Sequence, residues 1–237
     1  MPLQPPALIL AAGRGERLRP LTDTCPKPLL LVRGKPLIEW HLEALARAGV
    51  RSVVINTAWL EDAFAAVLGD GSRWGLAIHY ANEHSDYGGA LETAGGIANA
   101  LPWLSPGGQA SDSFWVVSGD VFLPGFEFSA DAAARFAAGP LLAQLWLVPN
   151  APHHPQGDFG IDATTGLASH AEPRRTWASV GLFRAELFAG IARGTRLPLR
   201  PKLEAALAAG RLGAQAWDGA WTDVGTVERL RALNEGG

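Results

Sequence analysis

The sequence contains very little cysteine and no long apolar run. Cys25 is the only cysteine among 237 residues, so the chain cannot form an internal disulfide framework. No apolar stretch approaches the ~20 residues that a membrane-spanning helix needs, and the N-terminal segment lacks the features of a secretory signal. We therefore expect a cytoplasmic protein that does not insert into a membrane.

An excess of positive charge is absent as well. The 20 lysines and arginines are outnumbered by 23 aspartates and glutamates, which gives a formal net charge of −3 at pH 7. No overall basic field draws such a chain to nucleic acid or to an anionic membrane, so any recognition of anions must come from a local cluster of cations. Hydrophobic residues make up 48% of the chain, which is ample for the core of a globular domain.

Short apolar runs alternate with segments of helical periodicity along the first half of the chain. The expected strands occupy residues 7–12, 52–56, 76–80 and 114–120, and the expected helices occupy residues 36–49, 60–68 and 92–101. Strands separated by helices of this length are typical of crossover units, which build a mainly parallel sheet with helices on both faces. The sequence thus predicts an α/β fold.

The pattern changes after residue 140. Strand-like runs are expected at residues 141–149, 157–166 and 176–184, and helices at residues 185–192 and 201–209. A last amphipathic helix is expected from Thr226, which is suited to an N-cap. We interpret the strand-like runs as a mixed or antiparallel extension of the sheet.

A loop rich in cations follows the first expected strand. Residues 10–30 read LAAGRGERLRPLTDTCPKPLL and carry Arg14, Arg17, Arg19 and Lys27. In an open parallel sheet, ligands bind beyond the carboxyl ends of the strands. Glycines let the backbone approach a ligand closely, and arginine and lysine side chains suit phosphate oxygens. The loop therefore predicts a binding site for an anion.

Two familiar phosphate-binding motifs are absent from this loop. The G-x-G-x-x-G fingerprint fails because Leu18 stands in place of the third glycine, and no P-loop is present because Gly34 and Lys35 are followed by Pro36. The second expected strand ends in VVINTAW, without the acid that binds a ribose in nicotinamide dehydrogenases. The sequence therefore disfavours a nicotinamide dehydrogenase and a P-loop enzyme.

The same loop resembles, almost position for position, the signature of the sugar-phosphate nucleotidylyltransferases, L-A-A-G-x-G-x-R-[LM]-x-P-L-T followed by P-K-P. This family joins a nucleoside triphosphate to a sugar 1-phosphate and releases pyrophosphate. The resemblance implies a Rossmann-like three-layer sandwich with a mainly parallel central sheet and a small sugar-side β extension. It also implies a single domain, in which residues 1–140 bind the nucleotide and residues 141–237 bind the sugar.

The family's reaction accounts for the cations and requires a metal. A sugar phosphate oxygen attacks the α-phosphorus in line, so charge on both reactants and on the leaving pyrophosphate must be neutralised. By resemblance, Arg17 neutralises the β and γ phosphates, and Lys27 lies between the α-phosphate and the sugar phosphate. Mg²⁺ needs carboxylate ligands, which the resemblance assigns to Asp120 in VVSGD and Asp223 in WTDVGT. Arg17, Lys27 and Asp120 are thus the predicted catalytic residues, and Asp120 and Asp223 the predicted metal ligands.

The resemblance also assigns contacts to both substrates. The predicted nucleotide-binding residues are Leu10, Ala11, Ala12, Gly13, Gly15, Arg17, Thr93 and Gly95. The predicted sugar-phosphate-binding residues are Lys27, Asp158, Phe159, Gly160, Glu172 and Gly181. The segment LETAGGI at residues 91–97 corresponds to the family's base-reading segment, although two glycines in a helix are equally consistent with close packing.

One segment departs from the family pattern. Many relatives carry an E-K-P element whose lysine holds the sugar phosphate, whereas this chain reads HAEPRRTW and has no lysine there. Arg174 or Arg175 could substitute, but a guanidinium binds phosphate with a different geometry from an ammonium. The identity of the sugar is therefore less firmly predicted than the reaction.

Within the family, the short chain and the segments PNAPHHPQGDF and LETAGGI most resemble the branch that uses UTP and N-acetylmuramate α-1-phosphate in cell-wall sugar recycling. Branches that attach thymidylyl or uridylyl groups to glucose 1-phosphate, or guanylyl groups to mannose 1-phosphate, remain open. A nonenzymatic nucleotide-binding regulatory subunit is a further alternative, but such subunits typically lose a metal acid or the P-K-P lysine. The expected protein is a monomer or a small homo-oligomer.

Overall fold

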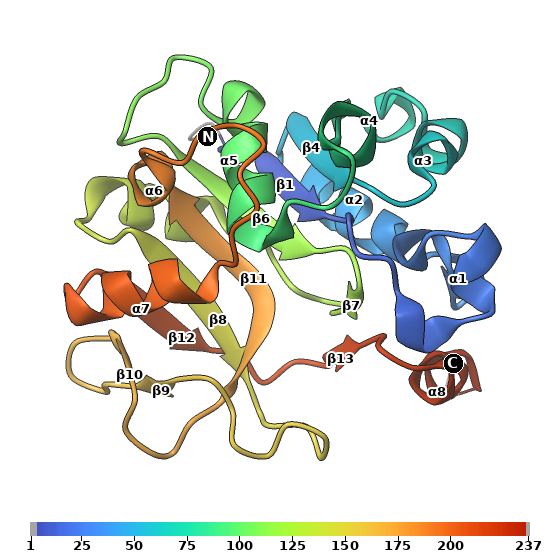
Figure 1. The fold of residues 1–237 in the computed structure, drawn as a ribbon. Helices are drawn as coiled ribbons and strands as arrows, with labels where there is room; N and C mark the ends of the chain where they lie inside the picture. Colours follow the sequence, from blue (N-terminus) through green and yellow to red (C-terminus); the bar gives the residue numbers. More distant parts are fainter. Residues whose placement is uncertain (1–3, 236–237) are drawn as a thin grey trace.

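The first expected strand forms β1, Ala7–Leu10, at the centre of a seven-stranded sheet (Figure 1). The computed structural model describes residues 4–235. Strand β1 pairs in parallel with β4, Ser52–Thr57, on one side and with β6, Ser113–Ser118, on the other. These three strands therefore end at the same edge of the sheet.

The full strand order is β12-β8-β11-β6-β1-β4-β5. The remaining strands of this sheet are β5 (Ala77–Asn82), β8 (Ala143–Val148), β11 (Thr176–Arg184) and β12 (Leu212–Ala216). Strand β11 runs antiparallel to both of its neighbours, and all other pairs are parallel. The mainly parallel sheet and its antiparallel element were both expected.

Alternate residues of the central strands enter two separate cores. Ile9 and Val53 pack in one hydrophobic cluster, and Leu8 and Val54 pack in another. The first cluster includes buried residues of α2 (Leu37–Arg47), α3 (Glu61–Leu68) and α6 (Ala130–Ala138). The second includes buried residues of α5 (Glu92–Leu104) and α7 (Arg200–Ala208), which lie in front of the sheet in Figure 1. The predicted three-layer α/β architecture is confirmed.

A third, smaller core joins the N-terminal loop to the C-terminal helix α8, Val227–Glu235. Leu18 and Val32 contribute from the loop, and Leu230 contributes from α8. The short strands β7 (Val121–Phe122) and β13 (Thr222–Asp223) pair antiparallel beside this core. The segment that follows β1 is therefore fastened to the C-terminal helix α8.

Several short elements complete the fold. The short helices are α1 (Leu21–Thr24) and α4 (Glu83–Tyr87), the two remaining strand pairs are β2 (Leu31–Val32) with β3 (Lys35–Pro36) and β9 (Gly160–Ile161) with β10 (Ala168–Ser169), and single 3-10 turns occupy Glu16–Leu18, Lys27–Leu29, Ser72–Trp74 and Ala185–Phe188. Among residues 4–235, no helix is both long enough and apolar enough to cross a lipid bilayer.

Two sequence-based expectations differ from the structure in the second half of the chain. The helix expected at residues 185–192 is only a 3-10 turn, because Ala189 is extended and Gly190 has a φ of 78°. Strand β12 was not expected, since its sequence LGAQA lacks the β-branched residues that mark a strand. It forms because β8 offers a free edge with which it pairs in parallel.

Candidate active site

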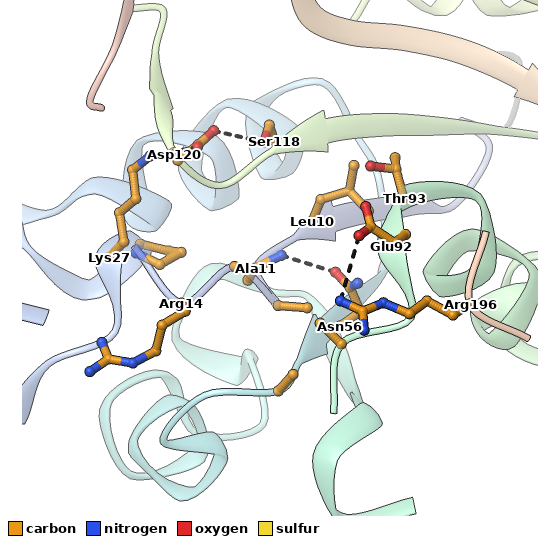
Figure 2. Close-up of a pocket in the computed structure, with 15 residues that line it drawn as sticks. Leu10, Ala11, Arg14, Lys27, Asn56, Glu92, Thr93, Ser118, Asp120 and Arg196 are labelled. Carbon is orange, nitrogen blue, oxygen red and sulfur yellow. Dashed lines mark hydrogen bonds and ion pairs between the residues drawn. The ribbon is translucent and has the colours of Figure 1, made fainter. Parts of the chain in front are cut away.

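A cavity of about 460 Å³ opens at the carboxyl ends of β1, β4 and β6 (Figure 2). Its lining consists of Leu10, Ala11, Ala12, Gly13, Arg14, Lys27, Pro28, Asn56, Ala58, Ala90, Glu92, Thr93, Ser118, Asp120 and Arg196. This is the edge of a parallel sheet at which ligands bind. Seven of the predicted nucleotide-site and catalytic positions thus meet in one cavity: Leu10, Ala11, Ala12, Gly13, Lys27, Thr93 and Asp120.

An ion pair between Lys27 and Asp120 occupies one end of the cavity. Lys27 Nζ lies 2.6 Å from Asp120 Oδ2, and Ser118 Oγ donates a hydrogen bond of 2.7 Å to Asp120 Oδ1. The lysine is only 8% exposed, and the two residues are 93 positions apart in the chain. Burial alone would raise the pKa of Asp120, but the Lys27 charge and the hydrogen bonds from Lys27 and Ser118 outweigh it, so the pKa lies below its usual range. Asp120 is therefore a carboxylate at neutral pH.

The glycines of the first loop have different functions in the structure. Gly13 borders the cavity, and a Cβ added there would meet nothing within 4 Å. Gly15 has a φ of 69°, and a Cβ on it would lie 3.0 Å from Thr22 Cγ2 and 3.2 Å from Lys27 Cβ. Because Gly15 does not line the cavity, its observed function is to let the loop fold closely over Lys27.

The predicted cations of this loop do not all face the cavity. Arg14 lines it, but its guanidinium is held by Asp23 at 2.8 Å and by the Trp59 ring at 3.7 Å. Arg19 also pairs with Asp23, at 2.8 Å. Arg17 is exposed and does not line the cavity. The structure therefore brings Lys27, but not Arg17, to Asp120.

A buried network that sequence reasoning missed holds the loop in position. Asn56 Oδ1 accepts a hydrogen bond of 2.9 Å from the Ala11 amide, and its Nδ2 donates to Glu83 Oε1 at 2.7 Å. Glu83 Oε2 accepts a third hydrogen bond, of 2.7 Å, from the Leu91 amide at the start of α5. Burial raises the pKa of Glu83, while the bonds from Asn56 and Leu91 act in the opposite direction. This network connects two parts of the cavity lining to the fully buried Glu83 carboxylate. One part is Ala11, and the other is the segment that follows Leu91.

Gly95, a predicted nucleotide contact, packs against the chain instead of lining the cavity. Its amide donates to the Leu197 carbonyl at 3.0 Å, and a Cβ there would collide with the carbonyl oxygen of Thr195. Leu197 in turn donates to the Leu91 carbonyl at 2.9 Å. The absence of a side chain at Gly95 therefore lets residues 195–197 pack against the start of α5. Arg196, within this segment, lines the cavity.

Arg196 and Glu92 form a second charged pair in the cavity. Arg196 Nη2 lies 3.6 Å from Glu92 Oε1. Glu92 has a φ of 61°, a left-handed conformation that costs a residue other than glycine about 1–2 kcal/mol. The sequence carries no signal for Arg196, since this residue lies about a hundred positions from Glu92, which it approaches, and belongs to no recognised pattern.

Asp223 lies next to Asp120 along the backbone but in a different side-chain environment. In the β7–β13 pair, Asp223 is opposite Val121, and the Val224 amide donates to the Asp120 carbonyl at 2.8 Å. The Asp223 carboxylate contacts Arg229, and His153 Nε2 lies 3.0 Å from it. Asp223 lines a second cavity, of about 540 Å³, together with His153 and Arg229. The two predicted metal acids are therefore adjacent in backbone position.

The donor set can be tested against the requirements of Mg²⁺. Within residues 4–235, no three His, Cys, Asp or Glu side chains are grouped so that they could hold a metal ion. A closed protein cage such as a structural zinc site is therefore not present in the described chain. Mg²⁺ typically binds one or two carboxylates together with substrate phosphates, and Asp120 and Asp223 offer that number and type of ligand.

Apart from Lys27, the predicted sugar-phosphate-binding residues lie away from this cavity, around the β9–β10 hairpin and within β11 (Figure 1). Asp158 Oδ2 accepts from the Trp177 amide at 2.8 Å, and buried Phe159 lies 4.5 Å beneath the Arg200 guanidinium. Glu172 is exposed and accepts from the Arg174 amide at 2.8 Å. None of these three lines either cavity described above.

Close packing accounts for the two predicted sugar-side glycines. A Cβ on Gly160 would collide with the Ala171 carbonyl oxygen, and one on Gly181 would lie 2.7 Å from the Gln144 carbonyl oxygen. Neither lines the two cavities. Their contact with a sugar phosphate therefore stays a prediction.

The arginines suggested as substitutes for the missing lysine have partners of their own. Arg174 Nε donates to the His170 carbonyl at 2.9 Å, and Arg175 pairs with Asp218. Neither approaches Lys27 or Asp120 closely enough to share a hydrogen bond or ion pair with them. Of Lys27, Arg174 and Arg175, only Lys27 lines the cavity beside Asp120, and its contact with a sugar phosphate stays a prediction.

Comparison with known proteins agrees with the fold and the site. The nucleotidyl transferase family model matches residues 6–236. The chain is 48% identical over 228 residues to the N-acetylmuramate alpha-1-phosphate uridylyltransferase of Neisseria meningitidis, covering 95% of each chain. It is 31% identical over 260 residues to a glucose-1-phosphate thymidylyltransferase of an Actinoplanes species, covering 97% of this chain and 79% of the relative.

A solved structure shares the fold. The crystal structure of a candidate glucose-1-phosphate thymidylyltransferase from Bacillus anthracis superposes with a TM-score of 0.78, at 20% identity and with 97% of this chain and 93% of that chain covered. The match of the family model over nearly the whole length, together with a full-length relative at 48% identity, identifies the family. The chain belongs to the nucleotidyl transferase family.

Proposed function

We propose that the protein transfers the uridylyl group of UTP to N-acetylmuramic acid α-1-phosphate, forming UDP-N-acetylmuramic acid and pyrophosphate. The observation that carries the reaction class is the Lys27–Asp120 ion pair, at 2.6 Å, in a cavity that Ala11, Ala12 and Gly13 also line. The choice of substrates rests on the 48% identity to the uridylyltransferase of Neisseria meningitidis. A product of this kind would serve cell-wall sugar recycling.

The geometry supports a direct displacement. An oxygen of the sugar 1-phosphate attacks the α-phosphorus of UTP in line, and the bond from that phosphorus to the bridging oxygen of the leaving pyrophosphate breaks. Lys27 is buried, lies against Gly15 and is held by Asp120, so its ammonium is preorganised for the charge that develops at the α-phosphate. No covalent enzyme intermediate is required, and Cys25 has no role in this scheme.

Asp120 and Asp223 would hold Mg²⁺. When bound, the ion neutralises phosphate oxygens and makes the α-phosphorus more electrophilic. Asp120 is suited to this task because its pKa lies below the usual range, so the carboxylate does not have to lose a proton first. Asp223 is a candidate for the second ligand because the pairing of β13 with β7 brings it beside Asp120 along the backbone.

Arg17 is proposed to contact the β and γ phosphates after a rearrangement of the loop. The side chain is exposed, and it forms no salt bridge with another residue between positions 4 and 235. A free guanidinium on a glycine-containing loop next to the cavity is available to move toward a triphosphate. In this proposal, residues 1–140 bind the nucleotide and residues 141–237 contribute the sugar side.

The experiment is a pyrophosphate-release assay that combines UTP, dTTP, CTP, ATP and GTP with the 1-phosphates of N-acetylmuramic acid, glucose and mannose. We expect the highest kcat/KM for UTP with N-acetylmuramic acid α-1-phosphate. A higher value for glucose or mannose 1-phosphate would replace the proposed acceptor. Absence of turnover with every pair, in a folded protein that binds nucleotides, would favour the nonenzymatic regulatory subunit.

A further inference from the structure

A buried histidine of α2 contacts the short strand that links the two proposed metal ligands. His41 is 3% exposed, and its Nε2 has no hydrogen-bond partner. Strand β7 begins at Val121, directly after Asp120, and Val121 lies opposite Asp223 in β13. No step of the proposed displacement uses this imidazole, so its function is open.

The pairing of β7 with β13 leaves the Val121 carbonyl without a partner in that ladder. The Val224 amide donates to the Asp120 carbonyl at 2.8 Å, so Asp120 and Val224 form a hydrogen-bonded pair. In an antiparallel ladder, opposite residues alternate between pairs that exchange hydrogen bonds and pairs that do not. Val121 and Asp223 are the next pair along the ladder, so the Val121 carbonyl points away from β13.

His41 supplies the missing partner. Burial lowers the pKa of His41 to about 4, against the opposite effects of a hydrogen bond with the Val121 backbone and of the Asp120 charge, so the ring is neutral at pH 7. A hydrogen bond that favours the protonated ring is one that the ring donates, so its acceptor is the Val121 carbonyl. A neutral imidazole has one N–H. Because Nε2 has no partner, Nδ1 is the donor.

Packing of α2 against β7 does not require an imidazole. Trp40 meets Phe122 edge-on, with ring centroids 5.1 Å apart, and Ile38 and Leu42 share a hydrophobic cluster with Val121. A buried nitrogen without a partner costs free energy that an apolar side chain at the same position would not. A histidine here therefore indicates a use for its directed hydrogen bond.

We propose that His41 is a positioning residue for the metal site, because its bond to the Val121 carbonyl fixes the strand that carries Asp120 and pairs with Asp223. This inference rests on the proposed use of the two aspartates as metal ligands. The Val224 amide holds one edge of the strand and His41 holds the other. Ligands fixed in this way lose less freedom when an ion binds, and such outer partners typically contribute roughly 10–100-fold to metal affinity or activity.

The experiment is a titration with Mn²⁺, a substitute for Mg²⁺ that electron paramagnetic resonance detects, without nucleotide or sugar phosphate. Steady-state kinetics with Mg²⁺ and thermal midpoints are measured on the same proteins. His41→Leu removes the donor at similar volume, His41→Gln moves an amide to the place of Nε2, and His41→Asn keeps an amide donor at the place of Nδ1. Asp120→Asn reports the loss of a metal ligand. The matched control is Leu45→Val, which truncates another buried residue of α2.

We expect His41→Leu and His41→Gln to weaken Mn²⁺ binding roughly tenfold or more and to lower kcat, with little change in the KM of UTP. His41→Asn should keep most of the wild-type Mn²⁺ affinity, because it retains the donor to Val121. Leu45→Val should lower the thermal midpoint and leave the Mn²⁺ affinity unchanged. Together these results would separate a directed hydrogen bond from a general loss of stability.

Wild-type Mn²⁺ affinity and kcat in folded His41→Leu and His41→Gln would overturn the inference. Equal losses in these variants and in His41→Asn, or an equal loss in Leu45→Val, would assign the effect to packing and overturn it as well. If Asp120→Asn loses the ion while His41→Leu and His41→Gln keep it, only the inference fails and the proposed metal site stands. If Asp120→Asn binds Mn²⁺ as tightly as the wild type, the proposed metal site fails, and the inference fails with it.

Discussion

At the proposed nucleotide end of the molecule, buried side chains and backbone amides shape the cavity, whereas exposed ion pairs are common on the proposed sugar side. Lys27, Asn56 and Glu83 are each less than a tenth exposed. On the sugar side, Arg200 and Glu204 are 48% and 36% exposed in their ion pair. Buried, fully bonded groups hold one geometry, while exposed pairs contribute at most about 1 kcal/mol and exchange partners readily.

The difference has a functional consequence. A nucleoside triphosphate presents the same phosphates whichever sugar it reacts with, so a rigid frame suits that half of the reaction. In the proposed function, the sugar side must fit one acceptor among several similar ones, and exposed side chains on its loops could adapt to that acceptor. We therefore expect substitutions at the nucleotide end to change the chemical step or the fold, and substitutions on the sugar side to change mainly the KM of the acceptor.

The largest effect is expected for Asp120→Asn. The amide removes the charge that is proposed to bind the metal and leaves the buried Lys27 ammonium without its partner, so kcat for pyrophosphate release should fall by at least roughly 10³-fold. Circular dichroism should show an unchanged secondary structure. The control Asp131→Asn removes an exposed carboxylate of α6 and should keep full activity. Wild-type turnover in Asp120→Asn would remove this residue from the chemistry.

The next largest effect is expected for Lys27→Ala. Because the ammonium is preorganised for charge in the transition state, kcat should fall by roughly 10²–10³-fold while the KM of UTP changes much less. Steady-state kinetics over both substrates measures the two separately, with Lys202→Ala, a lysine of α7 outside both cavities, as the control. A rise in KM with an unaltered kcat would mean that Lys27 binds ground state and transition state equally.

An intermediate effect is expected for Gly96→Ala, which disturbs the buried network without touching the cavity. The new Cβ would lie 2.7 Å from both Asn56 Nδ2 and Glu83 Oε1. Overpacking of this kind should lower the free energy of unfolding by about 1–3 kcal/mol and raise the KM of UTP, because Ala11 loses its fixed position. Urea unfolding and kinetics measure both effects.

The matched control for that substitution is Gly89→Ala, where a Cβ meets nothing within 4 Å. It should be close to neutral in both measurements. If Gly96→Ala were equally neutral, the network of Asn56 and Glu83 would not be the rigid support that distinguishes the nucleotide end.

The smallest effect is expected on the sugar side, for Arg200→Ala. The substitution removes exposed ion pairs with Glu204 and Asp158, and it removes the guanidinium that lies over the Phe159 ring. The free energy of unfolding should therefore fall by less than about 1 kcal/mol. The KM of the sugar phosphate should rise a few-fold, and the KM of UTP should stay constant. A large loss of kcat would break the contrast between the two regions. Arg47→Ala, in α2, serves as the control, because it removes another exposed arginine in an ion pair with a glutamate.

The parts of the site that follow a strand were predictable from sequence. The apolar run before Gly13 and the run before Asp120 are recognisable strands, and parallel strands end at a common edge, so their following loops had to meet. The same reasoning predicted the three-layer fold. Family resemblance added Lys27 and Asp223, whose positions in the chain alone do not reveal that they approach Asp120.

The remaining parts depend on tertiary packing that has no local signal. Asn56 and Glu83 look like ordinary polar residues at strand ends, and only the folded chain shows that they bind Ala11 and each other. Arg196 reaches the cavity because residues 195–197 pack on Gly95, whose amide donates to the Leu197 carbonyl. The two partners are about a hundred positions apart in the chain. Gly95 was predicted to line the cavity, since a glycine required for packing and one required for a ligand look alike in a sequence.

Whether Asp120 and Asp223 act on one ion is tested most directly by a double-mutant cycle on kcat for pyrophosphate release, using Asp120→Asn, Asp223→Asn and the double variant with UTP, N-acetylmuramic acid α-1-phosphate and Mg²⁺. If the two carboxylates hold the same ion, the second substitution adds little to the first, and the double variant is about as slow as the slower single variant. Losses that multiply in the double variant would mean that the two aspartates act independently, which contradicts a shared metal site.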